Sequence, residues 1–385
     1  MRKKPVRDFL KIGIDARLSY RRGVGTYVAN LIQSLLKIDL NNEYYLFNAP
    51  DFFKKRFRAA RIQWVDLGLT NAAFYEQWDL PRAAQKHGLD FLHYIDNSAT
   101  VMSAFPYLLT LHDVMYTRPL SAVKLKPSLR QRFVHQYKKM VIPFSAIKAR
   151  RILTVSEYSK QEIFQHFGIS PRKIFVTPEG VDLIQFQRVK SHAIGREWKI
   201  LVHGAADERK NIQGVFQAAW RWAKRGHRFQ LMIQGMNEVE LRSTHYVEQA
   251  EELGLSPYIK WMGNVAREDL AASYAQADLF LYPSLMEGFG LPLLEAFACG
   301  VPVVTSNTTA LPEVAGKAAF LVNPEDPEEI AQAVKQVMTR PALRKRLIAR
   351  GLKRARLFTW LKTAWLTLEA YEDFGRELKA KNGHS

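Results

Sequence analysis

Short runs of apolar residues alternate along the chain with longer segments whose apolar positions recur at helical spacing. A continuous apolar run predicts a strand buried on both faces, because a half-exposed strand would alternate apolar and polar residues. In the first half, such runs predict strands at Lys11–Ala16, Tyr44–Phe47, Ile62–Val65, Phe91–Tyr94, Tyr107–Leu111 and Ile152–Val155. Strands and helices that alternate in this way form a parallel sheet with helices on both faces.

A second series of the same kind begins at Trp198. Its predicted strands are Trp198–His203, Phe229–Gln234, Ile259–Met262, Leu279–Tyr282, Val301–Thr305 and Phe320–Val322. Two series predict an α/β protein of two doubly wound domains, at residues 1–185 and 186–360, followed by a final helix at about 361–385. Ligands of such sheets bind beyond the carboxyl ends of the strands, so we expect the site in a cleft between the domains.

The composition excludes several classes of protein. With 47% hydrophobic and 12% aromatic residues, the chain can fill packed cores, which excludes a disordered protein. No apolar run approaches the roughly 18 residues that cross a bilayer. Residues 1–8 contain no apolar signal region and Cys299 is the single cysteine, so the sequence predicts a cytoplasmic protein.

The net charge of +19 is concentrated in the first half, where residues 1–185 have 29 Lys and Arg against 15 Asp and Glu. Between Val114 and Ser156 there is no acidic residue, and bases interleaved with apolar residues predict one or two basic amphipathic helices. We expect residues 118–151 to contact an anionic membrane surface, possible alternatives being a solvated face and, less favoured, a nucleic-acid site. The bases are Arg118, Lys124, Lys126, Arg130, Arg132, Lys138, Lys139, Lys148, Arg150 and Arg151.

Two glutamates eight positions apart (295 − 287) flank a glycine turn in the second half. Glu287 precedes the turn, and the sequence predicts that Glu295 lies in the first turn of the helix that follows. A loop that leads into a helix N-terminus offers backbone N–H groups and the positive end of a dipole, which suit a diphosphate. The carboxylates can accept hydrogen bonds from sugar or ribose hydroxyls. For a glycine turn alone, a structural role with solvated glutamates would be the preferred interpretation.

Three further motifs lie at predicted strand ends. Arg209 and Lys210 follow the first strand of the second series, where cations can neutralise a diphosphate, although most exposed Arg-Lys pairs are only solvated. Gly23 and Gly25 open a helix and could present N–H groups to a phosphate, or form a plain turn. His112 ends a strand next to an aspartate, where a satisfied structural histidine is the alternative.

Together these segments resemble the retaining glycosyltransferases of family four, which have the GT-B fold of two Rossmann-like domains facing a central cleft. The residues that carry the resemblance are the Glu-x7-Glu signature at Glu287 and Glu295 and the Gly-x4-Arg-Lys-Asn segment that starts at Gly204. The resemblance implies that the final helix returns to the first domain. It also implies catalytic residues His112, Glu287, Arg209 and Lys210, and donor-binding residues Gly23, Gly25, Arg209, Lys210, Glu287, Gly288, Phe289, Gly290, Leu291 and Glu295.

The resemblance further implies transfer of a hexose from a nucleoside diphosphate sugar to a glycan or lipid-linked acceptor, in cell-surface polysaccharide or lipopolysaccharide synthesis. Similarity to bacterial mannosyltransferases favours GDP-mannose as donor, and a UDP-hexose is the alternative. The sequence contains no Asp-x-Asp motif, so no metal or other cofactor is expected. An alternative hypothesis, from another functional class, is a non-catalytic protein that has the same fold and binds membrane or nucleic acid.

Overall fold

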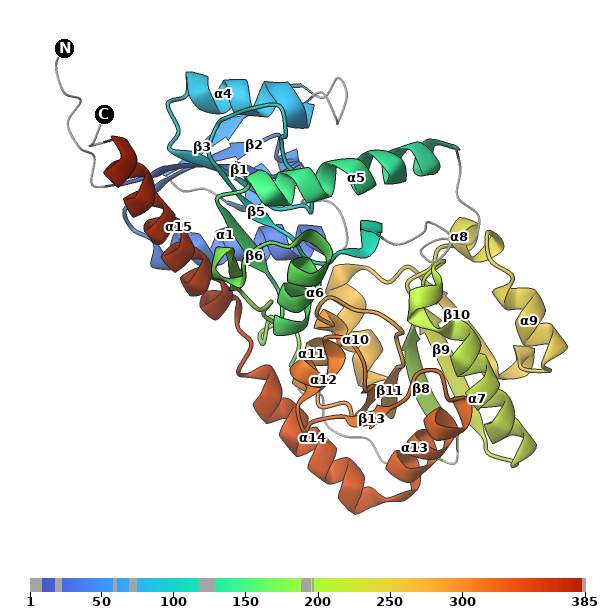
Figure 1. Cartoon of the computed structure of the whole chain (residues 1–385). Coiled ribbons are helices and arrows are strands. Elements are labelled where there is room, and N and C mark those ends of the chain that lie inside the picture. The colour runs from blue at the N-terminus through green and yellow to red at the C-terminus, as the bar shows by residue number, and fades with distance from the viewer. Residues whose placement is uncertain are drawn as a thin grey trace, which may run out of the picture. The chain divides into compact units, whose positions relative to one another are not determined.

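The computed structural model describes residues 9–17, 23–57, 61–68, 75–117, 129–187, 195 and 197–382 (Figure 1). The chain divides into two compact units. Unit 1 comprises Met1–Tyr116, Val134–Glu179 and Trp360–Ser385, and unit 2 comprises Thr117–Phe133 and Gly180–Thr359. The final helix therefore belongs to the unit that contains the N-terminal half of the chain.

Unit 1 contains a parallel sheet of seven strands among the described residues, in the order β3-β2-β1-β4-β5-β6-β7. Six of these strands are the ones predicted, and the sequence analysis missed the edge strand β7, in which only Ile174 is buried. The strands are β1 (Lys11–Asp15), β2 (Glu43–Phe47), β3 (Ile62–Val65), β4 (Phe91–Tyr94), β5 (Tyr107–Thr110), β6 (Arg151–Thr154) and β7 (Ile174–Val176).

Helices cover both faces of this sheet, as the continuous apolar runs predicted. Alternate strand residues such as Ile12 and Leu46 pack with α1 and α15, while their neighbours such as Phe47 and Leu92 pack with α4, α5 and α6. The helical elements that lie wholly or mostly in unit 1 are α1 (Val24–Ile38), α2 (Asp51–Arg56), the π-helix η1 (Tyr75–Asp79), α4 (Leu80–Lys86), η2 (Met115–Thr117), α5 (Leu129–Lys148), α6 (Glu157–Phe167), η4 (Pro171–Lys173) and α15 (Trp360–Asn382).

In the described part of unit 2, six strands form a parallel sheet in the order β10-β9-β8-β11-β12-β13. This order, with the first strand of the unit at the centre, is that of the doubly wound nucleotide-binding fold. The strands are β8 (Trp198–His203), β9 (Phe229–Gln234), β10 (Ile259–Gly263), β11 (Leu279–Tyr282), β12 (Val303–Ser306) and β13 (Phe320–Val322).

The helical elements of unit 2 connect these strands, and Trp222 of α7 is its largest fully buried side chain. They are η5 (Glu208–Lys210), α7 (Ile212–Lys224), α8 (Glu238–Arg242), α9 (Tyr246–Glu252), η6 (Ser256–Tyr258), η7 (Arg267–Asp269), α10 (Leu270–Ala275), α11 (Leu291–Ala298), α12 (Leu311–Ala315), α13 (Pro327–Thr339) and α14 (Pro341–Ala355). None of the helices described in either unit has the length and apolar character that crossing a bilayer requires.

The described part of the acid-free segment contains one long helix, α5, within the predicted one or two, and this helix continues through Pro143. One detail of the sequence prediction changes. Glu295 lies in the second turn of α11, not in the first as predicted, because α11 begins at Leu291.

The buried face of α15 provides a test of the fold. Phe374 is fully buried, and its ring lies 5.0 Å from that of Phe91 on β4, whereas Trp365 of the same helix is 61% exposed. Phe374→Ala should lower the free energy of unfolding by about 3–5 kcal/mol, because it leaves a cavity between helix and sheet. Trp365→Ala should change it by less than about 0.5 kcal/mol. Urea unfolding followed by circular dichroism would measure both, and equal effects would contradict this packing of α15.

Candidate functional site

A cluster of three polar side chains lies at the carboxyl ends of β8 and β11 in unit 2. The Lys210 ammonium donates hydrogen bonds to the Tyr282 hydroxyl at 2.6 Å and to Glu287 Oε1 at 2.7 Å. The Tyr282 hydroxyl donates to the same carboxylate oxygen, also at 2.7 Å. The structure therefore brings together two of the predicted site residues from loops that are 77 positions apart.

The electrostatics of this cluster favour the ionised form of Glu287. Burial alone would raise the pKa of its carboxyl, but Lys210 and Arg209 outweigh burial and lower that pKa below its ordinary value. Burial and the adjacent Glu287 raise the pKa of Tyr282 well above its ordinary value, so this phenol keeps its proton and donates it in a hydrogen bond. A carboxylate and an ammonium thus lie side by side at the end of the sheet where ligands bind.

Arg209 is held by a different acid from the one that holds Lys210. Its guanidinium donates to Asp207 through Nε at 3.2 Å and Nη2 at 2.8 Å, a bidentate pair. Its backbone carbonyl accepts from the amide of Leu285, which ties the Arg209 loop to the loop after β11. A ligand phosphate would therefore meet two cations already positioned by Asp207 and Glu287.

Asn211 fixes the loop that carries both cations. It has a left-handed backbone conformation with φ of 54°, and its amide nitrogen donates to the carbonyls of Pro283 and Pro324. Its side-chain oxygen caps α7 by accepting from Gly214. The loops after β8, β11 and β13 are thus joined by one side chain, a positioning role that the sequence analysis did not assign.

The glycine turn brings α11 to the same end of the sheet. Gly290 is the N-cap of α11, with a φ of 102° that favours glycine, and an added Cβ would lie 2.6 Å from Leu311. Because glycine has no side chain, it leaves the first amides of α11 without a side-chain cap. Phe289 is buried against Phe358, with 5.8 Å between ring centroids, and so anchors the turn. Gly288 and Leu291 complete the predicted turn.

Glu295 is buried on α11 and belongs to a polar chain that the sequence analysis missed. The Tyr274 hydroxyl donates to Glu295 Oε2 at 2.9 Å and lies 3.3 Å from His203 Nε2, which in turn is 2.5 Å from the amide nitrogen of Gln234. The Ser273 hydroxyl donates to the side-chain oxygen of Gln234. The sequence signal that could have indicated this chain is a polar residue at the end of an apolar strand, as at Gln234.

The remaining predicted residues lie in unit 1. Gly23 is the N-cap of α1, with a φ of 71°, and Gly25 is buried in its first turn. His112 follows β5 and is engaged at both ring nitrogens: Nε2 lies 3.1 Å from the carbonyl of Ile95 and Nδ1 lies 3.6 Å from Glu179. Burial would lower the pKa of His112, but Glu179, helped by Asp113 and Asp96, raises it.

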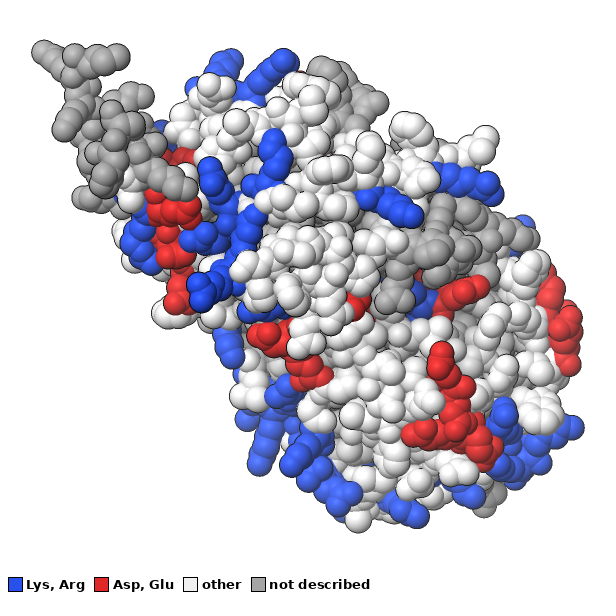
Figure 2. Space-filling view, in the orientation of Figure 1, with Lys and Arg blue, Asp and Glu red and all other residues white. Residues whose placement is uncertain are grey.

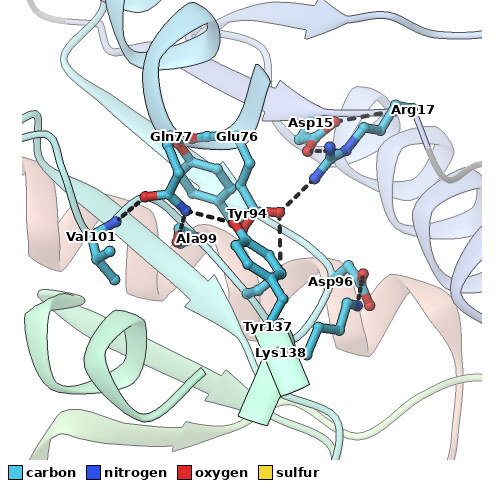
Figure 3. A network of polar contacts seen from close by, with 11 residues as sticks. Asp15, Arg17, Glu76, Gln77, Tyr94, Asp96, Ala99, Val101, Tyr137 and Lys138 are labelled. Carbon is cyan, nitrogen blue, oxygen red and sulfur yellow. Dashed lines mark hydrogen bonds and ion pairs between the residues drawn. The ribbon is translucent and has the colours of Figure 1, made fainter. Parts of the chain in front are cut away.

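A second buried charge network lies in unit 1 and was also missed (Figure 3). Arg17, just after β1, pairs with Asp15 at 3.0 Å and with Glu76 at 2.7 Å, and Lys138 of α5 pairs with Asp96 at 2.8 Å. Burial raises the pKa values of Asp15 and Glu76, and Arg17 opposes this rise. Lys138 was predicted to be part of a basic surface, and this is wrong because its ammonium forms an ion pair with Asp96 inside the unit.

This network depends on a rare backbone form. The π-helix η1 carries Glu76 and Gln77, and Gln77 bonds both to the hydroxyl of Tyr137 and to the backbone of Ala99 and Val101 (Figure 3). Insertion of one residue into a helical turn changes which side chains face inward, and such turns are frequent at functional sites. The part of the chain that the structure describes contains no group of three or more His, Cys, Asp or Glu side chains arranged to hold a metal ion.

The pairing of Lys210 with Glu287 predicts a pH-dependent loss of stability in Lys210→Met. Removal of the ammonium leaves a buried carboxylate short of a partner, so the free energy of unfolding at pH 7 should fall by about 1–3 kcal/mol. The folded pKa of Glu287 lies below its ordinary 4.5, so the pairing stabilises the fold above pH 4.5 and is lost as the pH falls through the folded pKa. The deficit of the variant should therefore shrink in acid.

Urea unfolding at a series of pH values would measure this deficit. Lys335→Met is the matched control, because Lys335 is an exposed lysine on α13 of the same unit. A deficit in Lys210→Met that is no larger than in the control, or that does not depend on pH, would contradict the pairing.

The contact of His112 with Glu179 predicts a raised histidine pKa. Histidine Cε1 resonances of the wild type should include one that titrates above 6.5 and disappears in His112→Gln. Glu179→Gln should lower that pKa, because it removes the neighbouring negative charge. Glu372→Gln, an exposed change on α15, should leave it unchanged. Identical titration in wild type and Glu179→Gln would refute this assignment.

Comparison with known proteins gives the family. The family described as "Glycosyl transferases group 1" matches residues 184–354, and the family described as "Glycosyltransferase Family 4" matches residues 21–185. O-antigen chain mannosyltransferase B of Escherichia coli is 32% identical over 274 residues, which are 68% of this chain and 69% of that protein. The MMP alpha-(1->4)-mannosyltransferase of Mycolicibacterium hassiacum is 33% identical over 233 residues, 57% of this chain and 53% of the relative.

Solved structures agree at the level of the fold. A sucrose-phosphate synthase from Thermosynechococcus elongatus superimposes with a TM-score of 0.75 at 19% identity, over 95% of this chain and 99% of its own. The Anabaena protein HepE in complex with UDP and glucose does so with a TM-score of 0.72 at 17% identity, over 94% of this chain and 100% of its own. This chain belongs to the glycosyltransferases of group 1 and family 4 and has their GT-B fold.

Proposed function

We propose that this glycosyltransferase is a retaining mannosyltransferase that uses GDP-mannose and transfers the sugar to a glycan or lipid-linked acceptor in cell-surface polysaccharide or lipopolysaccharide synthesis. The observation that carries the proposal is the cluster of Lys210, Tyr282 and Glu287 next to the glycine-capped N-terminus of α11. It combines a cation and the positive end of a helix dipole for a diphosphate with a carboxylate that can accept from sugar hydroxyls.

In this proposal the donor diphosphate lies between the N-terminal end of α11 and the side chains of Arg209 and Lys210. Lys210 turns part of its hydrogen bonding from Glu287 to a phosphate oxygen, and Glu287 then accepts from hydroxyls of the transferred sugar. Asp207 and Tyr282 keep the two cations in place during this exchange. Cations held in position before the ligand arrives stabilise the leaving diphosphate without further reorganisation.

The transfer step needs no separate nucleophile. The bond between the anomeric carbon and the diphosphate oxygen breaks, and the acceptor oxygen forms a bond to that carbon on the same face. The acceptor proton passes to a phosphate oxygen of the leaving GDP. The configuration is therefore retained, and the protein contributes orientation and charge stabilisation.

Glu295 and His112 receive supporting roles. The buried carboxylate of Glu295, held by Tyr274, accepts from the ribose hydroxyls of the nucleotide. His112, whose ring nitrogens lie near Ile95 and Glu179, takes part in holding the donor sugar by charge or by hydrogen bonding, as do Gly23 and Gly25 at the start of α1. Arg209 and Lys210 supply the positive charge that a metal ion supplies in other sugar transferases, so binding of the donor diphosphate does not require a divalent cation.

The choice of GDP-mannose over a UDP-hexose is supported by the relatives. Two of the curated relatives at 32% and 33% identity are mannosyltransferases by name. A UDP-hexose remains the alternative, because HepE was solved with UDP and glucose and has the same fold. Retention of Lys210, Glu287 and Glu295 argues against a non-catalytic scaffold that binds only membrane or nucleic acid. The proposed place of action is the cytoplasmic face of the membrane.

Isothermal titration with GDP, UDP and ADP, in EDTA and in Mg²⁺, tests the donor site. We expect selective GDP binding that survives EDTA and is weakened about tenfold to a hundredfold in Glu295→Ala, the cost of one charge-assisted hydrogen bond. Glu251→Ala, an exposed change on α9, should bind like the wild type.

Other outcomes separate the alternatives. Selective UDP binding would show that the donor is a UDP-hexose and not GDP-mannose. Absence of all nucleotide binding would favour the non-catalytic scaffold. NMR of the product formed from an α-linked donor would show an α-linkage for retention, and a β-linkage would overturn that part of the proposal.

A further inference from the structure

The outward side of α5 carries a stripe of large apolar side chains, interrupted by exposed Gln136. Leu129, Phe133, Met140, Phe144 and Ile147 are each between 54% and 84% exposed. Their spacings of four, seven, four and three residues place them on one side of the helix. A stripe of this length covers most of a 20-residue helix, whereas single exposed apolar residues are ordinary on protein surfaces.

The opposite side of α5 fixes the helix to unit 1. Ile142 and Ala146 are buried against the sheet, and the carbonyl of Ser145 accepts a hydrogen bond from the Tyr107 hydroxyl at 2.8 Å. The ammonium of Lys138 is held by Asp96 on the same inward side. The apolar stripe is therefore not the side of α5 that packs in the core, because the opposite side of the helix does so.

Basic side chains flank the stripe. At 100° per residue, Arg132 and Lys139 lie on one side of it, and Lys148, which also donates to the carbonyl of Val101, lies on the other. All three are exposed, and α5 contains no acidic residue. Figure 2 shows Lys and Arg side chains set among uncharged surface along α5. The predicted bases Arg118, Lys124 and Lys126 lie outside the described residues.

We propose that this side of α5 docks on the surface of an anionic phospholipid bilayer, with its axis in the plane of the membrane. The five apolar side chains would enter the boundary between headgroups and acyl chains, and Arg132, Lys139 and Lys148 would contact lipid phosphates. The inference goes beyond the proposed function, because it rests on α5 alone and would hold for any donor or acceptor.

Charge argues for this partner over two others. A second copy of the chain would place the bases of one α5 against those of the other, since a two-fold interface brings the same patch to both sides. Nucleic acid would use the bases but would leave five apolar side chains in water. A bilayer of anionic lipid satisfies both features of the surface at once.

Flotation of the full-length protein with vesicles tests the proposal. The wild type should float with vesicles of phosphatidylglycerol and phosphatidylcholine, and at least about tenfold less with phosphatidylcholine alone. The double variant Phe133→Ser/Phe144→Ser should reduce the bound fraction on anionic vesicles about tenfold or more, as should Arg132→Gln/Lys139→Gln. Trp365→Ser, an exposed aromatic on α15, and Lys335→Gln on α13 are the matched controls.

Several results would overturn the inference. Equal binding to both kinds of vesicle, or unchanged binding of the two α5 variants, would exclude this surface as the lipid contact. A wild type that is dimeric by light scattering and a double variant that is monomeric would assign the stripe to a second copy instead. Circular dichroism and nucleotide titration of the variants, expected to match the wild type, separate loss of docking from misfolding and from failure of the proposed donor site.

Discussion

The contact of Lys210 with Glu287 is the interaction on which the arrangement of unit 2 around its site depends. It joins the loop after β8 to the loop after β11, and Asn211 adds the loop after β13 to the same assembly. An unpaired ammonium or carboxylate at this depth would be costly, so each charge holds the other in place. The ammonium proposed to bind the diphosphate and the carboxylate proposed to bind the sugar are thus positioned by mutual attraction before any ligand is present.

Unit 1 also pairs its buried charges, with different residues. Arg17 with Asp15 and Glu76, Lys138 with Asp96, and His112 with Glu179 all pair near the carboxyl ends of parallel strands. At this edge the strands stop and the loops begin, so polar side chains gather where backbone N–H and carbonyl groups also lose their partners. Both units of the GT-B fold therefore concentrate paired charges at the sheet edge where ligands of such folds bind.

The basic helix α5 has an inner and an outer set of charged side chains. Lys138 neutralises a buried carboxylate, whereas Arg132 and Lys139 stay in solvent beside exposed Phe133 and Met140. The inner set fixes the orientation of α5, and this orientation decides which apolar residues face outward. The same helix can thus belong to the core and form an external surface.

The sequence by itself determined the repeated strand and helix pattern, the glycine turn before α11 and the identity of residues such as Glu287 and Lys210, because these depend on neighbours close in the chain. It missed the edge strand β7, in which only Ile174 is buried, and misplaced Lys138 on the surface. Tertiary structure alone decided that Tyr274 holds Glu295, that Glu179 faces His112 and that Glu76 pairs with Arg17. These contacts join residues up to 67 positions apart (179 − 112), and no local pattern encodes a pairing that forms only when separate strands end at one edge of a sheet.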